Sequence, residues 1–177
     1  MKDNFEKYVC KIGDKKDLLD RWEYLVDIHK GKDIWKKYRD NNIKNFDNGF
    51  IIPYYGVLEG KIICEITSYI NIEAFKGDIN NPKGLLDINM AYLAAFRTNK
   101  EYEGKGYFSK LYRFVEEDFK KRGYTKLSLG VSPEDVRNIE IYFHLGYKEY
   151  IKTVVEKENI NNQTIEEYIN FYKKNIL

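Results

Sequence analysis

Two glycines, Gly104 and Gly106, lie one residue apart in the stretch EYEGKGYFSKLYRF, residues 101–114. Glycine lets a backbone approach a ligand closely, because no Cβ atom is in the way. If a helix begins at this point, its first N–H groups have no partners within the helix and its dipole is positive there. Such a turn can bind an anion, most naturally a phosphate, and Lys105 and Lys110 could add positive charge. The same pair of glycines is also compatible with an ordinary tight turn.

Phosphate-binding loops with more specific signatures are absent from the sequence. There is no G-x-x-x-x-G-K-[ST] motif, which excludes the P-loop nucleotidase class. There is also no G-x-G-x-x-G motif after the first predicted strand, so a dinucleotide-binding Rossmann domain is not expected. The glycine pair instead lies in the middle of the chain, between an apolar strand-like run and an amphipathic run.

The amphipathic run that begins at Gly106 predicts a helix that ends at Gly123. Its apolar residues recur at helical spacing, and charged residues occupy the opposite face. A second helix is predicted over residues 136–146, with Ser132 as its N-cap and Asp135 in its first turn. The apolar residues that share one face of the first of these helices are Phe108, Leu111, Val115 and Phe119.

Hydrophobic periodicity places these two helices within a longer alternation of strands and helices. A change from helical to strand period, with Glu59 and Gly60 at the turn, predicts a hairpin within residues 49–72. The resulting order is β α α β β β α β α β β, which indicates an α/β or α+β domain with one mixed sheet. The other predicted elements are strand 7–14, helix 15–30, a helix capped by Asp33 and extending through Phe46, a loop at 73–88, and strands at 88–99, 125–131, 147–157 and 164–174.

Composition limits the classes of function. The chain has 177 residues, 43% of them hydrophobic, which suits one domain over residues 1–177 with a sizeable core. Lys+Arg 30 and Asp+Glu 28 nearly cancel, so no basic face for nucleic acid is expected. No apolar run is long enough to span a membrane. Cys10 and Cys64 have no metal-like spacing, and two free thiols suggest a reduced, cytoplasmic protein that holds no metal.

Residues 91–150 resemble the core of the GNAT superfamily of N-acetyltransferases. That family carries Gln/Arg-x-x-Gly-x-Gly/Ala between its fourth strand and third helix, and the matching residues here run from Glu103 to Phe108. Gly106 matches the central glycine, whereas Glu103 and Phe108 depart from the pattern at its two ends. The family's Leu-Tyr-x-x-x-Gly-Phe pattern resembles residues 141–147, with Tyr142 in register.

The resemblance implies a GNAT-like α+β fold, with a mixed, mostly antiparallel sheet of about seven strands flanked by about four helices. It also implies that acetyl-CoA binds between splayed fourth and fifth strands. Backbone amides of the glycine turn would hold the pyrophosphate, and backbone groups at the end of the preceding strand would meet the pantetheine arm. The implied cofactor-binding residues are Phe96, Arg97, Thr98, Gly104, Lys105, Gly106, Tyr107, Phe108, Ser109 and Asn138.

In the family, an amine attacks the thioester directly and a tyrosine protonates the leaving thiolate. Tyr142 matches that tyrosine, although it could also be one more packed aromatic residue in a chain with 16 tyrosines. Asp135 takes the place where many relatives have an asparagine that touches the cofactor, and Asn138 is the nearest amide. Asp135 could equally serve only as a helix-capping residue beside Ser132.

Glu65 is the candidate general base, because it is a charged residue in the apolar run ICEITSYI and burial could raise its pKa. The alternation of the strand is equally consistent with a solvent-facing side chain. Asp87 and His144 are weaker candidates. His29 lies on the apolar face of the first helix, which favours a packed histidine.

The predicted activity is acetyl transfer from acetyl-CoA to a small primary amine, a small molecule held by the first two helices and the 73–88 loop. The alternatives are an inactive module of the same fold that senses acetyl-CoA, and an interaction domain that binds no CoA. Family members are often dimers, so the resemblance leaves a homodimer open.

Overall fold

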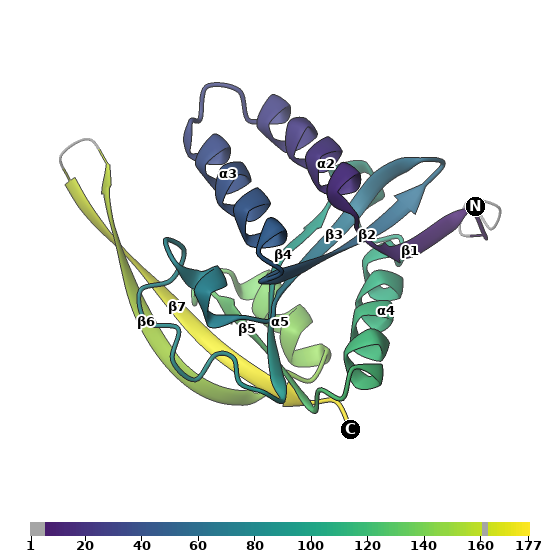
Figure 1. Ribbon diagram of the computed structural model, residues 1–177. Helices are drawn as coiled ribbons and strands as arrows, with labels where there is room; N and C mark the ends of the chain where they lie inside the picture. Colours follow the sequence, from purple (N-terminus) through teal and green to yellow (C-terminus); the bar gives the residue numbers. More distant parts are fainter. Residues whose placement is uncertain (1–5, 161–162) are drawn as a thin grey trace.

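The computed structural model describes residues 6–160 and 163–177, which form one seven-stranded sheet with helices on both faces (Figure 1). The strands are β1 (Tyr8–Ile12), β2 (Ile51–Leu58), β3 (Lys61–Tyr69), β4 (Met90–Thr98), β5 (Lys126–Val131), β6 (Glu149–Ile160) and β7 (Gln163–Asn175). The helices are α2 (Lys15–Ile28), α3 (Ile34–Asp47), α4 (Tyr107–Lys121) and α5 (Val136–His144), with short 3₁₀ turns η1 (Ile72–Phe75) and η2 (Lys100–Tyr102). The predicted α+β class and order of elements are confirmed.

The sheet has the strand order β1-β2-β3-β4-β5-β7-β6. Strands β4 and β5 run parallel, and every other neighbouring pair is antiparallel. The prediction of a mixed, mostly antiparallel sheet is therefore confirmed. The hairpin between β2 and β3 turns at Glu59 and Gly60, as their turn-forming residue types predicted.

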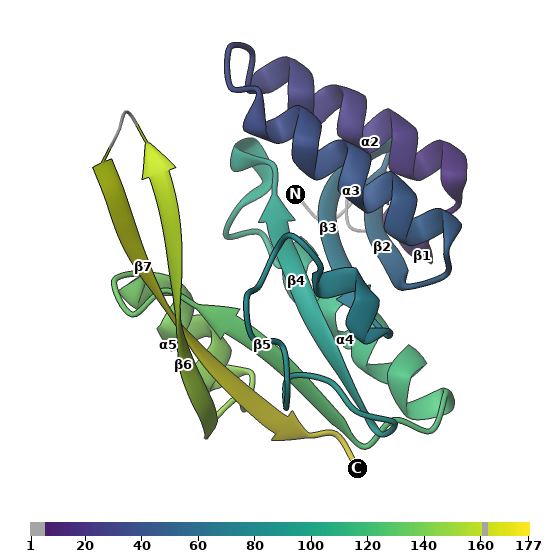
Figure 2. The same ribbon diagram turned by 60° about the vertical axis from the view of Figure 1, so that its left-hand side comes forward.

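Strands β4 and β5 separate soon after they meet (Figure 2). Their pairing covers only Met90–Tyr92 of β4 against Lys126–Ser128 of β5. Further along β4, Ala95 has a φ of 55° and the register with β3 shifts between Glu65 and Thr67. Such a bulge bends a strand and increases its twist. The end of β4 thus loses its neighbour on the β5 side.

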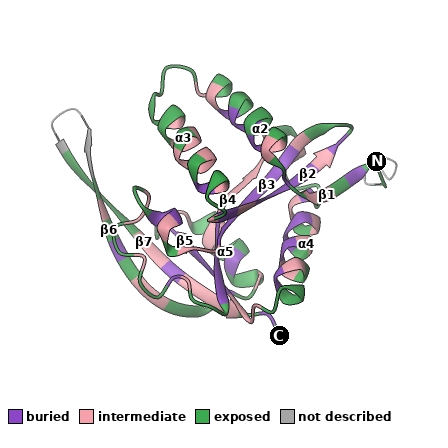
Figure 3. Cartoon of the chain, in the orientation of Figure 1, coloured by how far each residue is buried: buried purple, intermediate pink, exposed green. Residues whose placement is uncertain are grey.

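Helix α4 packs on one face of the sheet, across β1, β2 and β3. Its buried residues Leu111, Val115 and Phe119 are those of the predicted apolar face. Phe119 contacts Tyr54 of β2, with ring centroids 6.0 Å apart. Buried residues recur along α4 and alternate with more exposed ones (Figure 3). This packing fixes where the first turn of α4 lies relative to β4.

Helices α2 and α3 cover the opposite face of the sheet (Figure 2). Leu18, Trp22 and Leu25 of α2 form a buried cluster, against which Trp35 of α3 packs. The segment between β3 and β4 lies on the same face and contains only the short turn η1, which agrees with the predicted loop. The elements that the family resemblance assigns to the acceptor side therefore lie together.

Two predicted helix caps are wrong. Asp135, rather than Ser132, is the N-cap of α5, and its side chain accepts a hydrogen bond from the N–H of Asn138. An aspartate closer to the first helical turn reaches the unpaired N–H groups better than a serine three residues earlier. Asp33 precedes α3 but caps nothing, because its backbone is already helical and its carboxylate pairs with Lys36.

The chain closes with the long antiparallel hairpin of β6 and β7. Strand β7 pairs with β5, which places the hairpin at the β5 side of the sheet. The helices within the described residues are all too short or too polar to cross a membrane.

Candidate functional site

A cleft of about 1210 Å³ opens where β4 has separated from β5. It extends from the glycine turn and the start of α4, past the end of β4, to α2 on one side and α5 on the other. Tyr142 lines it, as do most of the predicted cofactor-binding residues. Those residues are Phe96, Arg97, Thr98, Gly104, Gly106, Tyr107, Phe108, Ser109 and Asn138.

The glycine turn leaves the N-terminus of α4 open to the cleft. Gly104 has a φ of 70° and Gly106, the N-cap residue, a φ of 84°, a left-handed conformation that other residues adopt only with strain. Among the described residues no side chain caps α4, whereas α2 has a complete capping box and α5 is capped by Asp135. The N–H groups of Phe108 and Ser109, in the first turn of α4, make no hydrogen bond within these residues and remain available to an anion.

The end of β4 presents a second row of backbone groups to the cleft. The N–H of Asn99 donates to the carbonyl of Ile63 on β3. Because the hydrogen-bonding direction alternates along a strand, the backbone groups of Phe96 and Thr98 point the other way, toward the missing β5 neighbour. Extended backbone of this kind can pair with the amide groups of a pantetheine arm.

Tyr142 lies on α5 beside this row. Its ring packs against Phe96, with centroids 5.2 Å apart, and only 6% of the residue is exposed. Burial, with a smaller contribution from the Asp135 carboxylate, raises the pKa of Tyr142 to about 12. Within the described residues its hydroxyl has no hydrogen-bond partner, although it is not sealed from the cleft. The hydroxyl is therefore protonated at neutral pH and free to donate.

Phe108, which departs from the family pattern, contributes to the same wall of the cleft. Its ring lies 5.8 Å from that of Phe96 and 6.3 Å from that of Tyr112. The side chain is half-buried and packs on the edge of the core, as its helical position predicted. The substitution therefore leaves the backbone of the turn exposed to the cleft.

Two charged side chains of the glycine turn, Glu103 and Lys105, already have partners within the protein. Glu103, the other departure from the family pattern, forms an ion pair with Arg137 of α5 at 3.2 Å. Lys105 is exposed and donates to the carbonyl of Glu101, and it does not line the cleft. Of the predicted cofactor-binding residues, Lys105 is thus the one that the structure does not bring into the cleft.

Asn138 lines the cleft, but its side-chain amide is already hydrogen-bonded to Asp135. Its amide nitrogen donates to the carboxylate of Asp135, whose other oxygen accepts from the Asn138 backbone. Asp135 therefore organises the start of α5, in agreement with the capping alternative. A contact between Asn138 and a cofactor stays a prediction.

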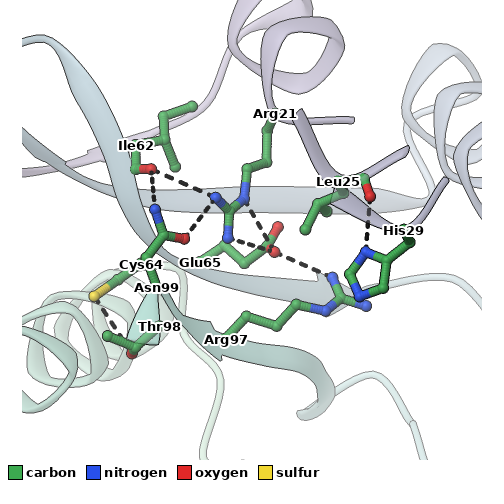
Figure 4. A network of polar contacts seen from close by, with 9 residues as sticks. All are labelled: Arg21, Leu25, His29, Ile62, Cys64, Glu65, Arg97, Thr98 and Asn99. Carbon is green, nitrogen blue, oxygen red and sulfur yellow. Dashed lines mark hydrogen bonds and ion pairs between the residues drawn. The ribbon is translucent and has the colours of Figure 1, made fainter. Parts of the chain in front are cut away.

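Glu65 is buried beneath the cleft and does not line it (Figure 4). Its Oε1 accepts from Arg21 Nε at 3.2 Å and lies 3.1 Å from Arg21 Nη2. The same oxygen accepts from Arg97 Nη1 at 3.1 Å. Both arginines line the cleft, so they lie between this carboxylate and any bound amine. The predicted burial of Glu65 is correct, and its role as a base is left without a geometric basis.

The weaker base candidates lie in different places. His29 lines the cleft, stacks on Trp35 with centroids 3.6 Å apart, and has Nδ1 2.7 Å from the carbonyl of Leu25. His144 also lines the cleft, at the end of α5. Asp87 lies outside it, where its carboxylate accepts from the Asn89 N–H. The packed-histidine interpretation of His29 is thus correct, although the ring remains at the wall of the cleft.

Sequence reasoning missed the importance of two cleft arginines. The resemblance implied Arg97 as a cofactor-binding residue, because it lies between Phe96 and Thr98 at the end of the strand. Its side chain pairs instead with Glu65 on the adjacent strand. Arg137 was not among the predicted site residues, and it forms an ion pair with Glu103. The two charged residues stand in two apolar runs, Glu65 in the middle of one and Arg97 near the end of the next, which was a signal that they could pair across strands.

Comparisons with known proteins agree with this geometry. Residues 17–147 match the model of the GNAT family of acetyltransferases. No curated protein matched the chain. Among solved structures, the ribosomal-protein-S18-alanine N-acetyltransferase of Escherichia coli is similar with a TM-score of 0.66 at 15% identity, covering 96% of this chain and 94% of its own.

Two further structures give the same result. NAA60 of Arabidopsis thaliana, solved with a bisubstrate analogue, has a TM-score of 0.68 at 15% identity, with 96% of this chain and 99% of that chain covered. The yncA protein of Salmonella typhimurium, solved with its cofactor acetyl-CoA, has a TM-score of 0.62 at 12% identity, with 97% and 95% covered. These likenesses establish the fold. The family match spans most of the sequence, and the chain belongs to the GNAT family of acetyltransferases.

Proposed function

We propose that this protein transfers the acetyl group of acetyl-CoA to the primary amine of a small molecule. The observation that carries the proposal is the N-terminus of α4, which follows two left-handed glycines, opens into the cleft and has no capping side chain among the residues that the structure describes. An uncapped helix start of this kind favours a phosphate-bearing ligand.

The cleft fits the other parts of acetyl-CoA as well. The pyrophosphate would accept hydrogen bonds from the N–H groups at the start of α4, and the hydroxyl of Ser109 lies at the same wall. The pantetheine arm would lie along the backbone of Phe96 and Thr98, in the place that β5 leaves. The thioester would then reach Tyr142, whose ring lies against Phe96.

The proposed reaction is a direct transfer. The amine nitrogen forms a bond to the acetyl carbon, the carbon–sulfur bond breaks with its electron pair on sulfur, and the thiolate takes up a proton. Tyr142 is the proposed donor of that proton, because its raised pKa keeps the hydroxyl protonated at neutral pH. The proton released by the amine passes to water in the cleft, since Glu65 does not line it.

The acceptor would enter from the side of α2 and α3. These helices contribute Tyr24, Leu25, Ile28 and Trp35 to the cleft, a mixed apolar and aromatic wall. A cleft wall of this composition can hold the carbon skeleton of a small amine.

Thermal unfolding with and without acetyl-CoA tests the proposal. A ligand that binds only the native state raises the melting temperature by mass action. We expect a clear increase with acetyl-CoA and none with ATP, which has phosphates but no pantetheine arm. Release of free CoA thiol in the presence of a panel of primary amines then tests transfer. If millimolar acetyl-CoA leaves the melting temperature unchanged, the proposal fails.

A further inference from the structure

We infer that Arg97 binds a carboxylate of the acceptor, so that the substrate is an amine that also carries a carboxylate, such as an amino acid. The inference rests on the proposed function and adds the chemical class of the acceptor. It follows from the charge balance, the free hydrogen-bond donors and the position of the Arg97 side chain.

The charge balance at this end of the cleft is positive. Arg21 and Arg97 share the single carboxylate of Glu65, so two guanidinium charges face one negative charge (Figure 4). The residues that α2 and α3 contribute to the cleft include no aspartate or glutamate. Complementarity of charge therefore favours an acceptor with a negative group at this position.

Arg21 has no capacity left for a ligand. Its side chain is 2% exposed, and it donates to Glu65, to the carbonyl of Ile62 and to the side chain of Asn99. Arg97, by contrast, is 31% exposed and lines the cleft. The surplus positive charge is thus presented to the cleft by Arg97.

Arg97 also keeps one edge of its guanidinium group for a ligand. Nη1 donates to Glu65, and in the part of the chain that the structure describes Nε and Nη2 make no hydrogen bond. These two nitrogens lie side by side on the opposite edge and donate in parallel. That spacing matches the two oxygens of a carboxylate, which can accept both hydrogen bonds at once.

The side chain is held in place before a ligand arrives. Its guanidinium carbon lies 5.3 Å from the centre of the Trp35 ring and 5.9 Å from that of Trp22, and Glu65 fixes the far edge. A cation over an indole face is favourable. Because little side-chain freedom remains to be lost, binding a carboxylate here costs less than it would at a mobile arginine.

The position of Arg97 determines where an acceptor bound to it would lie. Arg97 follows Phe96 in β4, and Phe96 packs against Tyr142. Successive side chains of a strand point to opposite faces of the sheet, so Arg97 points toward Trp22 and Trp35 while Phe96 points toward Tyr142. An acceptor held by Arg97 would therefore lie on the α2 and α3 face of the sheet, and its amino group would have to reach the thioester past the end of β4, where β5 has separated.

Acceptors that differ only in the carboxylate test this inference. Acetylation rates would be measured for a panel of L-amino acids beside the amines that lack the carboxylate, such as L-phenylalanine with phenethylamine and L-leucine with isoamylamine. We expect kcat/KM to be about 10- to 100-fold higher for the amino acid, the range that charge-assisted hydrogen bonds give. The difference should lie mainly in KM.

Variants of Arg97 identify the recognising group. Arg97→Gln should remove the preference, and Arg97→Lys, which keeps the charge but not the paired donors, should keep part of it. Arg137→Gln removes another cleft arginine and should leave the ratio between amino acid and amine unchanged. Arg21 still pairs with Glu65 in the Arg97 variants, and thermal unfolding would check that they fold.

Binding of N-acetyl amino acids in the presence of CoA gives a second readout that needs no turnover. Calorimetry should detect the N-acetyl amino acid but not the matching N-acetyl amine. Equal kcat/KM values, or a preference that survives Arg97→Gln, would overturn the inference while acetyl transfer stands. Acetyl-CoA binding without acetylation of any amino acid would overturn it too. If acetyl-CoA neither binds nor reacts, the proposed function itself falls.

Discussion

Tyr142 on α5 packs against Phe96 on β4, with ring centroids 5.2 Å apart, across the gap where β4 and β5 have separated. The contact places a protonated hydroxyl beside the strand edge on which a thioester would lie. The two residues come from elements that the sequence separates by a helix and a strand. In the proposed function, their contact would join the surface that binds the pantetheine arm to the donor of the proton.

Replacing Tyr142 with phenylalanine should therefore separate binding from turnover. We expect Tyr142→Phe to lower kcat by about 100-fold or more, the usual contribution of a general acid, with acetyl-CoA affinity nearly unchanged. Steady-state kinetics and calorimetry measure the two quantities. Tyr147→Phe is the matched control, because Tyr147 is fully buried, bonds to Tyr112 and lies outside the cleft. A Tyr142→Phe enzyme with normal kcat would exclude Tyr142 as the acid.

The pH dependence of kcat should reflect the raised pKa of Tyr142. The ordinary tyrosine pKa of 10.0 is raised to about 12 here, so the hydroxyl keeps its proton through the neutral and mildly alkaline range. Activity should rise with pH as the acceptor amine loses its proton, and Tyr142 should cause no decline below pH 10. An alkaline decline between pH 8 and pH 10 that disappears in Tyr142→Phe would contradict the assignment.

The raised pKa of Tyr142 also makes the free energy of unfolding decrease at alkaline pH. Because the folded state holds the Tyr142 proton more tightly than the unfolded state, its contribution is fully present below pH 10 and is lost as the pH rises toward 12. The difference in unfolding free energy between the wild type and Tyr142→Phe should shrink over that interval. Chemical denaturation at several alkaline pH values measures it.

The left-handed glycine at the start of α4 should matter for the ligand rather than for folding alone. Gly106 and Gly123 have φ values of 84° and 86° at opposite ends of the helix, so alanine at either adds a backbone strain of about 1–2 kcal/mol. Both variants should lose similar stability. Only Gly106→Ala should also lower acetyl-CoA affinity, by roughly tenfold, because it disturbs the N–H groups at the cleft. Equal affinities in the two variants would remove the glycine turn from the binding site.

Much of the fold followed from local pattern. The apolar spacing in α4, the glycine at the β2–β3 turn and the alternation of the closing strands each depend on residues near one another in sequence. The bulge at Ala95 did not follow, because alanine carries no signal for a φ of 55°. The separation of β4 from β5 depends on that region, and only the family resemblance anticipated it.

The parts of the candidate site that consist of backbone groups could be predicted from the sequence. The parts that depend on pairs of side chains could not. The glycine turn lies at the start of α4 and the end of β4 lies in the same cleft, as the sequence predicted for these two segments. Glu65 was expected to be a candidate base, yet it pairs with Arg21 and Arg97, which lie 44 and 32 residues away. Pairing of charges at such distances is set by the register of β3 against β4 and the position of α2, neither of which is readable from composition or period.

The ion pair between Glu103 and Arg137 should control the charge at the phosphate site. Arg137→Ala leaves the Glu103 carboxylate unpaired beside the glycine turn, so we expect weaker acetyl-CoA binding, by several-fold at low salt. Glu103→Gln removes the negative charge and should strengthen binding by a similar factor. Calorimetric titration of the two variants and the double variant measures the coupling.

Stability should hardly change in these variants, because both side chains are largely exposed and exposed pairs contribute about 0–1 kcal/mol. Thermal unfolding checks that the affinity changes do not come from partial unfolding. If Arg137→Ala and Glu103→Gln both leave affinity unchanged at low salt, the pair lies too far from the bound phosphates to matter.

Glu65 should prove to be a structural partner of the two arginines rather than the base. Glu65→Gln leaves two guanidinium groups, one of them 2% exposed, without their counter-charge, and we expect a loss of about 3–5 kcal/mol. For a chain of this length that loss lowers the melting temperature by roughly 10 °C. Glu59→Gln is the matched control, since its pair with Lys7 is mostly exposed and should contribute almost nothing. A Glu65→Gln variant with an unchanged melting temperature and kcat reduced 100-fold would instead establish Glu65 as the base.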